Sequence, residues 1–175
     1  MLFMEQVLNI SDAVFGEGYL TEDSIKLYKR NPNVNILKIE KDDVLQGFSI
    51  LQVLSLNELQ KELFVDLPND LKGFTKIGYR KMTAVHPKYK RLGLGVKLFE
   101  EGQKWFKDQH IDAVVTVSWI NPKTLKFRKF IESKGFKPIQ KLKGYWHQDS
   151  LDRNYNCLAC GAPPCHCSGM LYIKI

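Results

Sequence analysis

The chain has 175 residues, of which 44% are hydrophobic and 26% are charged. This length supports one domain with a sizeable core but not two, and the composition is typical of globular proteins. No apolar run is long enough to span a membrane, and the first residues lack the basic region of a secretion signal. We therefore expect a cytoplasmic protein that is not embedded in a membrane.

The net charge is +7, and the isoelectric point lies near 9.2. An excess of lysine and arginine suits an anionic partner, which would be nucleic acid, an acidic protein or a phosphorylated cofactor. The same excess is also typical of a solvated surface, and we favour that explanation for most of the lysines. The basic residues beside Gly93 are a separate case and are treated with the motif that contains them.

The hydrophobic pattern predicts alternating helices and strands along the chain. Residues 57–73 are weakly patterned and receive no assignment. The remaining segments indicate a single mixed α/β domain around one sheet. In chain order, the expected elements are one or two helices over 11–30, a hairpin of strands 34–40 and 44–54, a strand over 76–85, a helix from Gly95, a strand over 112–120, a helix over 121–135, and two last strands over 137–147 and 170–175.

Capping residues set the expected helix boundaries. Ser11 and Thr21 are of the types that begin helices, so each predicts a helix start in the N-terminal region. Asn121 followed by Pro122 predicts an N-cap with proline at the first helical position. Gly135 predicts the C-terminal end of that same helix.

The most informative segment joins the strand over 76–85 to the next helix and contains Gly93 and Gly95. Glycines at alternate positions let the backbone approach a ligand and point successive N–H groups into one concavity. That concavity opens at a helix N-terminus, where unpaired N–H groups and the macrodipole favour an anion. Lys90 and Arg91 add positive charge, so the segment predicts a cradle for a diphosphate.

The glycine pattern taken alone is more typical of a tight connection. It is neither a P-loop nor a dinucleotide fingerprint, because it lacks Gly-Lys-Ser/Thr and a third glycine. The preceding Val85-His86-Pro87, the basic pair and the strand–turn–helix context together favour the anion site.

The segment Lys90-Arg91-Leu92-Gly93-Leu94-Gly95, preceded by residues 83–87, resembles the acetyl-CoA signature of the GNAT superfamily of N-acetyltransferases, Gln/Arg-x-x-Gly-x-Gly/Ala. The resemblance extends to residues 43–48 and 121–136 and covers roughly residues 34–138. It implies an α/β (α+β) fold with one domain over residues 1–175. The mixed central sheet would be splayed between the strands ending at Val85 and Ile120 and flanked by helices.

The resemblance also implies the function of an acetyl-CoA-dependent N-acetyltransferase. Pantetheine would insert into the splayed sheet, the pyrophosphate would lie on backbone amides of the glycine turn, and an N–H near Val85 would stabilise the oxyanion. An acceptor primary amine held nearby would attack the thioester directly. The cofactor-binding residues carried over in this way are Thr83, Ala84, Val85, Lys90, Arg91, Leu92, Gly93, Leu94, Gly95, Val96 and Asn121.

The chain departs from the family pattern in three respects. Lys90 stands at the Gln/Arg position, and the helix after Asn121 is about one turn longer than usual. Ile131 occupies the place of the tyrosine that often protonates the departing thiolate. Tyr145 is a conceivable substitute, although packing at a sheet edge explains it better, and a histidine at the position of His86 is usually structural. We therefore name no catalytic side chain.

All four cysteines lie within residues 157–167, as Cys157-x2-Cys160-x4-Cys165-x-Cys167. Clustering in a reducing compartment favours a metal over disulfides or free thiols. Four thiolates suit a structural tetrahedral Zn²⁺, whereas iron–sulfur clusters use other spacings, and His166 is an alternative ligand. We expect residues 155–169 to form a metal-binding loop between the last two strands, and we hypothesise that it stiffens the region that selects the acceptor.

Two other functions stay open. One is a nucleic-acid or protein-binding module, in which a zinc hairpin sits on an inactive acetyl-CoA-binding fold. Tyr145, Trp146 and Tyr155 would then stack on bases, although sheet and hairpin packing is the simpler explanation. The other is a fold that binds acetyl-CoA without transferring the acetyl group. The sequence does not identify the acceptor among protein lysines, N-termini, polyamines, aminoglycoside-like sugars and other small amines, and we expect a monomer or homodimer.

Overall fold

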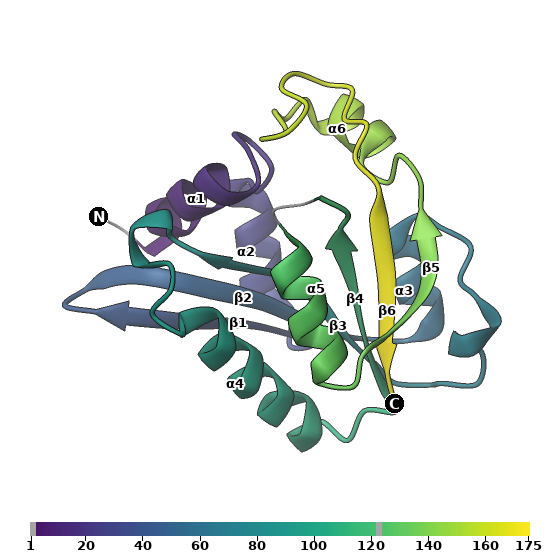
Figure 1. The fold of residues 1–175 in the computed structure, drawn as a ribbon. Coiled ribbons are helices and arrows are strands. Elements are labelled where there is room, and N and C mark those ends of the chain that lie inside the picture. The colour runs from purple at the N-terminus through teal and green to yellow at the C-terminus, as the bar shows by residue number, and fades with distance from the viewer. Residues whose placement is uncertain (1–2, 122–123) are drawn as a thin grey trace.

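The computed structural model describes residues 3–121 and 124–175. A six-stranded sheet with the strand order β1-β2-β3-β4-β6-β5 forms the centre, as Figure 1 shows. This is the expected mixed α/β domain. The elements are α1 (Phe3–Val14), α2 (Glu22–Arg30), β1 (Val34–Lys41), β2 (Val44–Leu54), α3 (Leu56–Leu63), β3 (Ile77–Val85), α4 (Leu94–Asp108), β4 (Ala113–Trp119), α5 (Leu125–Ser133), β5 (Lys137–Leu142), α6 (His147–Arg153) and β6 (Gly169–Lys174).

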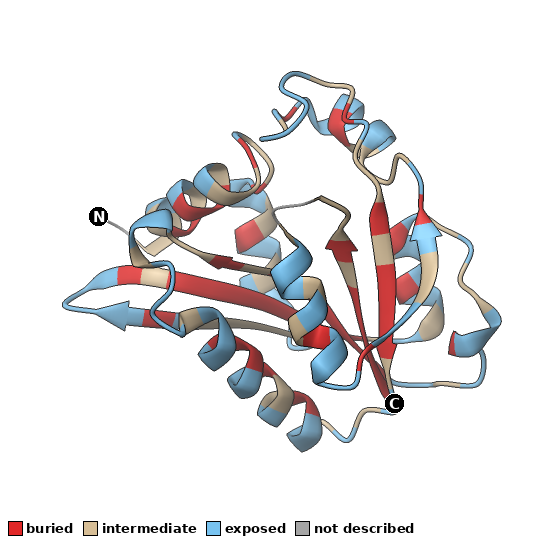
Figure 2. Cartoon of the chain, viewed as in Figure 1, coloured by how far each residue is buried: buried red, intermediate tan, exposed pale blue. Residues whose placement is uncertain are grey.

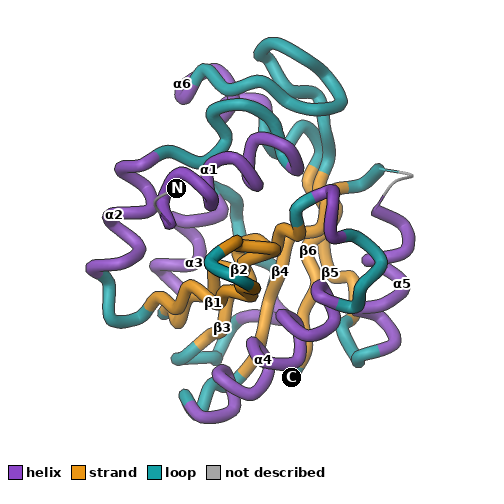
Figure 3. Tube along the Cα trace, turned by 90° about the vertical axis from the view of Figure 1, so that its left-hand side faces the viewer, coloured by secondary structure: helices purple, strands orange, loops and turns teal. Residues whose placement is uncertain are grey.

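Helices cover both faces of the sheet (Figures 1 and 3). The face covered by α1, α2 and α3 holds the buried side chains of Ile50 and Tyr79, whereas α4 and α5 pack on the opposite face around Leu51 and Phe99. Figure 2 shows that the strands are buried along much of their length while the outer sides of the helices are exposed. No helix in the described ranges is long and apolar enough to cross a membrane.

The sheet splits between β3 and β4, as the sequence resemblance implies. These parallel strands pair from Ile77 opposite Ala113 to Arg80 opposite Thr116 and then diverge. Beyond that point, β3 continues beside β2 and β4 continues beside β6. At the point of divergence, the hydroxyl of Thr116 donates a hydrogen bond to the Arg80 carbonyl over 3.0 Å. A V-shaped gap therefore opens between residues 81–85 and residues 117–119.

A bulge at Lys81 decides which backbone groups face this gap. The register with β2 passes from Arg80 to Met82 and leaves Lys81 without a partner. The Arg80 carbonyl points toward β4, whereas the Met82 carbonyl accepts a hydrogen bond of 3.0 Å from a serine hydroxyl on β2. Backbone groups of successive strand residues point to opposite sides. The extra residue therefore inverts the alternation and turns the backbone of Thr83 and Val85 toward the gap.

The hairpin of β1 and β2 and the start of α2 match the sequence prediction. Thr21 caps α2 and accepts a hydrogen bond from the Ser24 amide over 3.2 Å. The predicted helix start at Ser11 is wrong, because α1 begins at Phe3 and Ser11 lies in its last turn. The reason is an apolar stripe that begins before Ser11, and its buried members Val7 and Ile10 fix α1 against the sheet.

Two predictions in the C-terminal part are corrected. The strand expected over 137–147 ends at Leu142, because Gly144 turns the chain with a φ of 55° and α6 follows. The helix expected from Asn121 begins at Leu125 with Thr124 as its N-cap, while Pro122 lies outside the described residues. Gly135 follows the end of α5 with a φ of 90°, as expected of a glycine beyond a helix end.

Candidate functional site

The chain leaves β3 through a single 3-10 turn, Pro87–Tyr89, before it reaches α4. His86 caps this turn, since its Nδ1 accepts a hydrogen bond of 3.1 Å from the Lys88 amide. Its ring also lies 5.6 Å from the ring of Tyr89. The side chain of His86 is thus used to shape the turn, which agrees with the structural role expected for it.

Arg91 and Gly93 both adopt left-handed backbone angles, with φ values of 66° and 76°. Such residues turn neighbouring N–H groups toward one side of the chain. Gly93 is the N-cap of α4, and the first helical hydrogen bond runs from the Lys97 amide to its carbonyl over 3.0 Å. Within the described part of the chain, no backbone carbonyl or capping side chain accepts from the amides of residues 94–96, which are the orphan donors of a helix start.

The space above these amides is open. A Cβ placed on Gly93 would meet no protein atom within 4 Å, and one placed on Gly95 would meet only Val85 Cγ2 at 4.0 Å. Leu92 is 65% exposed and Val96 is 41% exposed. The turn therefore presents free N–H groups, a helix dipole and positive side chains to solvent, which is the arrangement that binds a phosphate.

The other edge of the gap is formed by the end of β4. The Ile120 amide donates to the Ser168 carbonyl over 2.8 Å, and the Asn121 amide donates to the Thr124 hydroxyl over 3.3 Å. Among the described residues, the buried hydroxyl of Ser118 has no hydrogen-bond partner. The residues predicted to bind the cofactor thus come together at the carboxyl ends of β3 and β4: 83–85 on one edge, 90–96 in the turn, and Asn121 on the other edge.

The position of the missing tyrosine holds no acid. Ile131 is fully buried in α5 and packs with Phe99 and Phe136. Tyr145 lies in the turn after β5 rather than in a strand, so that part of the sequence prediction is wrong. It packs edge-on against Trp146 at 4.8 Å and belongs to the face covered by α3. Burial raises the pKa of the Tyr145 phenol, which therefore stays protonated at neutral pH.

A charged pair lies on the face covered by α1, α2 and α3. The ammonium of Lys81 contacts the carboxylate of Glu62 on α3 and lies 5.8 Å and 6.0 Å from the ring centres of Tyr28 and Tyr79. The side chains of Lys81 and Glu62 keep 21% and 27% of their surface exposed. Burial tends to lower the pKa of Lys81, but the phenol of Tyr28 and the carboxylate of Glu62 outweigh it and raise the pKa.

Sequence reasoning missed this pair, although part of it had a readable signal. Ser55 and Glu58 form a capping box, since the Ser55 hydroxyl accepts from the Glu58 amide and the Glu58 carboxylate accepts from the Ser55 amide. This S-x-x-E pattern is visible in the sequence and marks the start of α3. The approach of Glu62 to Lys81 has no local signal, because it depends on how α3 packs on the sheet.

The four cysteine sulfurs converge just before β6, where Figure 1 shows α6 and the following loop beside the α1–α2 connection. All four Sγ atoms lie within 4.8 Å of one another. The Cys160 sulfur lies 3.5 Å from that of Cys167 and 3.9 Å from that of Cys165, and the Cys157 and Cys167 sulfurs are 3.8 Å apart. The exposed His166 packs against His147 at 5.7 Å, and the four cysteines complete a set of ligands without it.

The cysteine segment packs against the connection between α1 and α2. The Asn156 amide donates to the Glu17 carbonyl over 3.0 Å. A Cβ on Gly16 would lie 1.8 Å from the Asn156 carbonyl oxygen, so only glycine allows this approach. Arg153 of α6 donates to the Tyr19 carbonyl over 2.7 Å. The cysteine segment is therefore packed against the body of the protein rather than being a free hairpin. We call this surface, formed by the cysteine segment, α6 and the α1–α2 connection, the wall.

The aromatic residues considered for stacking on bases are occupied within the protein. Tyr155 is only 2% exposed, and its hydroxyl donates to the Asp149 carboxylate over 3.0 Å. Tyr145 and Trp146 are half-buried and pack on each other. This geometry offers no flat aromatic platform at the cysteine segment for a nucleic acid.

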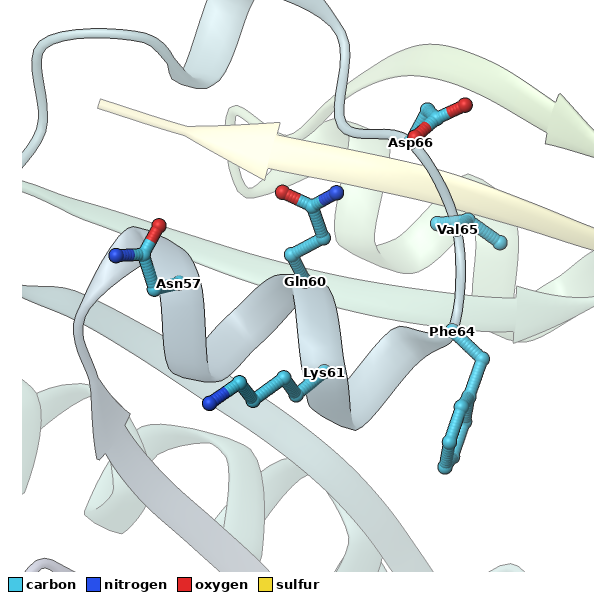
Figure 4. Close-up of a pocket in the computed structure, with 6 residues that line it drawn as sticks. All are labelled: Asn57, Gln60, Lys61, Phe64, Val65 and Asp66. Carbon is cyan, nitrogen blue, oxygen red and sulfur yellow. The ribbon is translucent and has the colours of Figure 1, made fainter.

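A shallow hollow of about 530 Å³ lies on the outer side of α3 (Figure 4), and none of its lining residues belongs to the glycine turn. Phe64 at its rim is 86% exposed. The hollow holds no cluster of reactive side chains, so we assign no chemistry to it. Its lining residues are Asn57, Gln60, Lys61, Phe64, Val65 and Asp66.

Comparison with known proteins agrees with this geometry. The sequence model of the acetyltransferase (GNAT) family matches residues 4–136. No curated protein matches the chain in sequence.

Solved structures of acetyltransferases resemble the fold at low sequence identity. The Escherichia coli ribosomal-protein-S18-alanine N-acetyltransferase is 13% identical, with a TM-score of 0.67 over 97% of this chain and 85% of that chain. Arabidopsis thaliana NAA60 in complex with acetyl-CoA is 13% identical, with a TM-score of 0.69 over 98% and 92%. Chaetomium thermophilum Naa20 in complex with a bisubstrate analogue is 16% identical, with a TM-score of 0.64 over 99% and 83%.

Proposed function

The chain belongs to the acetyltransferase (GNAT) family and is an acetyl-CoA-dependent acyltransferase, and from this premise we propose that it transfers the acetyl group to a primary amine by direct attack on the thioester. The observation that carries the proposal is the open glycine turn at the mouth of the splayed sheet. Its free amides lie next to a gap whose edges expose polar backbone groups, so one ligand can use both.

The turn and the gap bind different parts of the cofactor in this proposal. The amides from Lys90 to Val96 hold the pyrophosphate, and the side chains of Lys90 and Arg91 add charge. The backbone of Thr83 and Val85 binds the pantetheine arm from the β3 edge of the gap. Asn121 contacts the same arm from the β4 edge. The N–H groups that β3 directs into the gap stabilise the negative charge that develops on the thioester oxygen.

Direct attack fits this arrangement because, among the described residues, no serine or cysteine at the gap is paired with a histidine that would activate it as a nucleophile. The four cysteines, which belong to the segment beyond α6, are gathered around one another and form the proposed metal site. With Ile131 in place of an acid, the departing thiolate takes its proton from water or from the attacking amine. Holding the amine close to the thioester then supplies much of the rate acceleration.

A panel of amines tests the proposal on the purified protein. Acetyl-CoA should raise the melting temperature, and one or more amines should release free CoA thiol in proportion to the acetylated amine formed. Thermal stabilisation without CoA release for any protein, peptide, polyamine or sugar amine would contradict the transfer reaction. No stabilisation at all would contradict the cofactor site.

We also propose that Cys157, Cys160, Cys165 and Cys167 hold a structural Zn²⁺. Four thiolates around zinc at Zn–S distances of about 2.3 Å place the sulfurs about 3.8 Å apart. The distances of 3.5–3.9 Å between three pairs of these sulfurs fit that geometry. The amides of Ala159 and His166 each donate to a cysteine sulfur over 3.4 Å, which favours the thiolate form that a metal needs.

The proposed role of this metal is structural. It would hold the α1–α2 connection, which carries Tyr19, in place beside the bound acceptor. The supporting contacts are the hydrogen bonds that tie the cysteine segment and α6 to the α1–α2 connection. Elemental analysis of the native protein should find about one zinc per chain. Metal-free protein with four unmodified thiols, or with two disulfides by mass spectrometry, would contradict the site.

A further inference from the structure

We propose that Glu62 and Lys81 together receive the acceptor amine: Glu62 binds it, and the fixed positive charge of Lys81 favours its unprotonated, nucleophilic form. This inference rests on the proposed function. It adds a binding residue and an electrostatic residue to a reaction for which the family signature supplied no side chain.

The position of Lys81 in the sheet supports the proposal. Lys81 is the bulge residue where β3 and β4 begin to diverge, so its Cα lies at the closed end of the gap. Its ammonium reaches Glu62 on the face covered by α1, α2 and α3. The opposite face is covered by α4 and α5, and the glycine turn leads into α4. An acceptor that meets the thioester from the side away from α4 therefore passes this pair.

Glu62 is held at this place by the packing of α3. Leu59 and Leu63, on either side of it in sequence, are buried in the core. The capping box of Ser55 and Glu58 fixes the start of the same helix. Because the helix is anchored at both ends, the carboxylate of Glu62 is directed to Lys81 rather than to bulk water, and its 27% exposure leaves room for a ligand.

The other titratable groups around the pair carry little net charge. Tyr19, Tyr28, Tyr79 and Tyr145 face it from the α1–α2 connection, α2, β3 and the turn after β5. Burial raises the pKa of Tyr19, Tyr79 and Tyr145, so these phenols stay neutral. Behind Tyr19, Asp149 and Arg153 neutralise each other in an ion pair of 2.5 Å. An arriving ammonium therefore meets one carboxylate and one competing cation.

The competition between the acceptor ammonium and Lys81 for the carboxylate of Glu62 favours loss of a proton from the acceptor. An aliphatic amine has a pKa of about 10.4 and arrives protonated at neutral pH. The carboxylate of Glu62 binds the ammonium, which brings it next to Lys81. Two neighbouring cations repel, so the one with fewer stabilising contacts loses its proton more readily. Lys81 is held by the protein, and the acceptor is therefore the cation that deprotonates.

The atoms and charges of the step balance. The bound ammonium releases one proton to water, and its nitrogen lone pair attacks the thioester carbonyl carbon. The new C–N bond forms as the C–S bond breaks. The thiolate takes the second proton of the attacking nitrogen and leaves as CoA thiol, so one proton is released to solvent for each acetyl group transferred.

The experiment compares the pH dependence of kcat/KM for butylamine, spermidine and a short peptide with a free N-terminus. In Lys81→Met, which keeps the length of the side chain without the charge, the acidic limb should move up by about one pH unit. Activity at pH 7 should then fall about tenfold and recover at higher pH. Lys81→Arg should keep the native profile. Glu62→Gln should raise the KM for the amine about tenfold and change kcat less.

Lys61→Met is the matched control, because Lys61 precedes Glu62 on α3 but extends on the outer side of the helix (Figure 4). It should leave the pH profile unchanged. An unshifted profile in Lys81→Met, with normal melting and acetyl-CoA binding, would overturn the proposal. If Lys81→Met does not fold, an unchanged amine KM in Glu62→Gln overturns it. Failure of the wild type to acetylate any amine would instead reject the proposed function.

Discussion

The glycine turn and the wall that we propose to face the acceptor are built in opposite ways. The turn uses consecutive residues and acts through backbone amides that the protein leaves free. The wall brings together α3, the β3 bulge, the α1–α2 connection, α6 and the cysteine segment, and its proposed role depends on side chains such as Glu62 and Lys81. A site formed by the backbone of consecutive residues can therefore be predicted from a short sequence motif. A site assembled from side chains that are distant in sequence cannot.

The two regions should also respond differently to mutation. A change in the turn should alter cofactor binding without altering the fold, because the space above Gly93 and Gly95 is open. A change in the wall should alter the acceptor kinetics and the stability together, because its members hold one another in place. Four substitutions test this difference.

The largest effect is expected from Gly95→Asp in the turn. The new carboxylate would stand at the start of α4, where it favours the helix but repels the pyrophosphate. We expect acetyl-CoA affinity to fall by about 100-fold, which corresponds to about 2.7 kcal/mol, while the melting temperature stays the same or rises. Titration calorimetry and thermal melting measure the two quantities. Gly95→Asn is the neutral control, and equal binding by both variants would show that phosphates do not lie on these amides.

In the wall, Cys160→Ser should have the next largest effect. Removing one thiolate should release the metal and lower the melting temperature by about 5 °C or more, because metal binding is coupled to the folding of the segment. The acceptor KM should rise, and acetyl-CoA affinity should change less than twofold. Elemental analysis, melting and steady-state kinetics measure these effects. His166→Ala should retain the metal, and a loss of acetyl-CoA binding in Cys160→Ser would remove the distinction between the two regions.

Arg153→Met tests the tie between α6 and the α1–α2 connection. Arg153 donates to the Tyr19 carbonyl and pairs with Asp149, so its loss should free the segment that carries Tyr19. We expect the acceptor KM to rise about fivefold, a cost of about 1 kcal/mol for the lost hydrogen bonds. The exposed Arg30→Met is the control. An unchanged KM in Arg153→Met would place the acceptor elsewhere.

The smallest effect is expected from Glu58→Gln, at the start of α3. Hydrogen bonds from the Ser55 amide and hydroxyl lower the pKa of Glu58 in the folded protein. A lowered pKa means that the carboxylate stabilises the fold above the pKa it has when unfolded, and that this contribution is lost as the pH falls through the folded value. We expect Glu58→Gln to cost about 0.5 kcal/mol or less at pH 7 and nothing near pH 2, as measured by chemical denaturation. The exposed Glu101→Gln should cost nothing at either pH.

The parts of the fold that the sequence predicted are those with strong local patterns. The hairpin of β1 and β2 follows from two β-branched runs, and its turn residues Asp42 and Asp43 adopt the positive φ values of 51° and 60° that tight hairpin turns require. The glycine turn follows from the spacing of Gly93 and Gly95. In these segments neighbouring residues alone determine the conformation.

The parts that it did not predict depend on contacts between distant residues. The polar helix α6 has a weak pattern of its own and is held by the cysteine segment, for example by the hydrogen bond of 2.8 Å from the Cys165 amide to the Ser150 hydroxyl. Glu62 lies near the end of α3 and Lys81 lies within β3, and the long connection over 64–76 separates them, so no spacing rule links the two residues. The bulge had a weak signal, since Arg80 and Lys81 place two charges in succession in an otherwise apolar strand.

The bulge has a consequence for how such a protein can change its substrate. In the proposed cofactor site, access to the amides of Thr83 and Val85 would depend on the presence of one extra residue after Arg80, whatever its side chain is. Position 81 would then be free to vary in chemistry while the proposed cofactor site stays intact. On this proposal, replacing Lys81 by an acid, an amide or an apolar residue would change the acceptor and keep the same acetyl donor, whereas deleting the residue would abolish transfer to every acceptor.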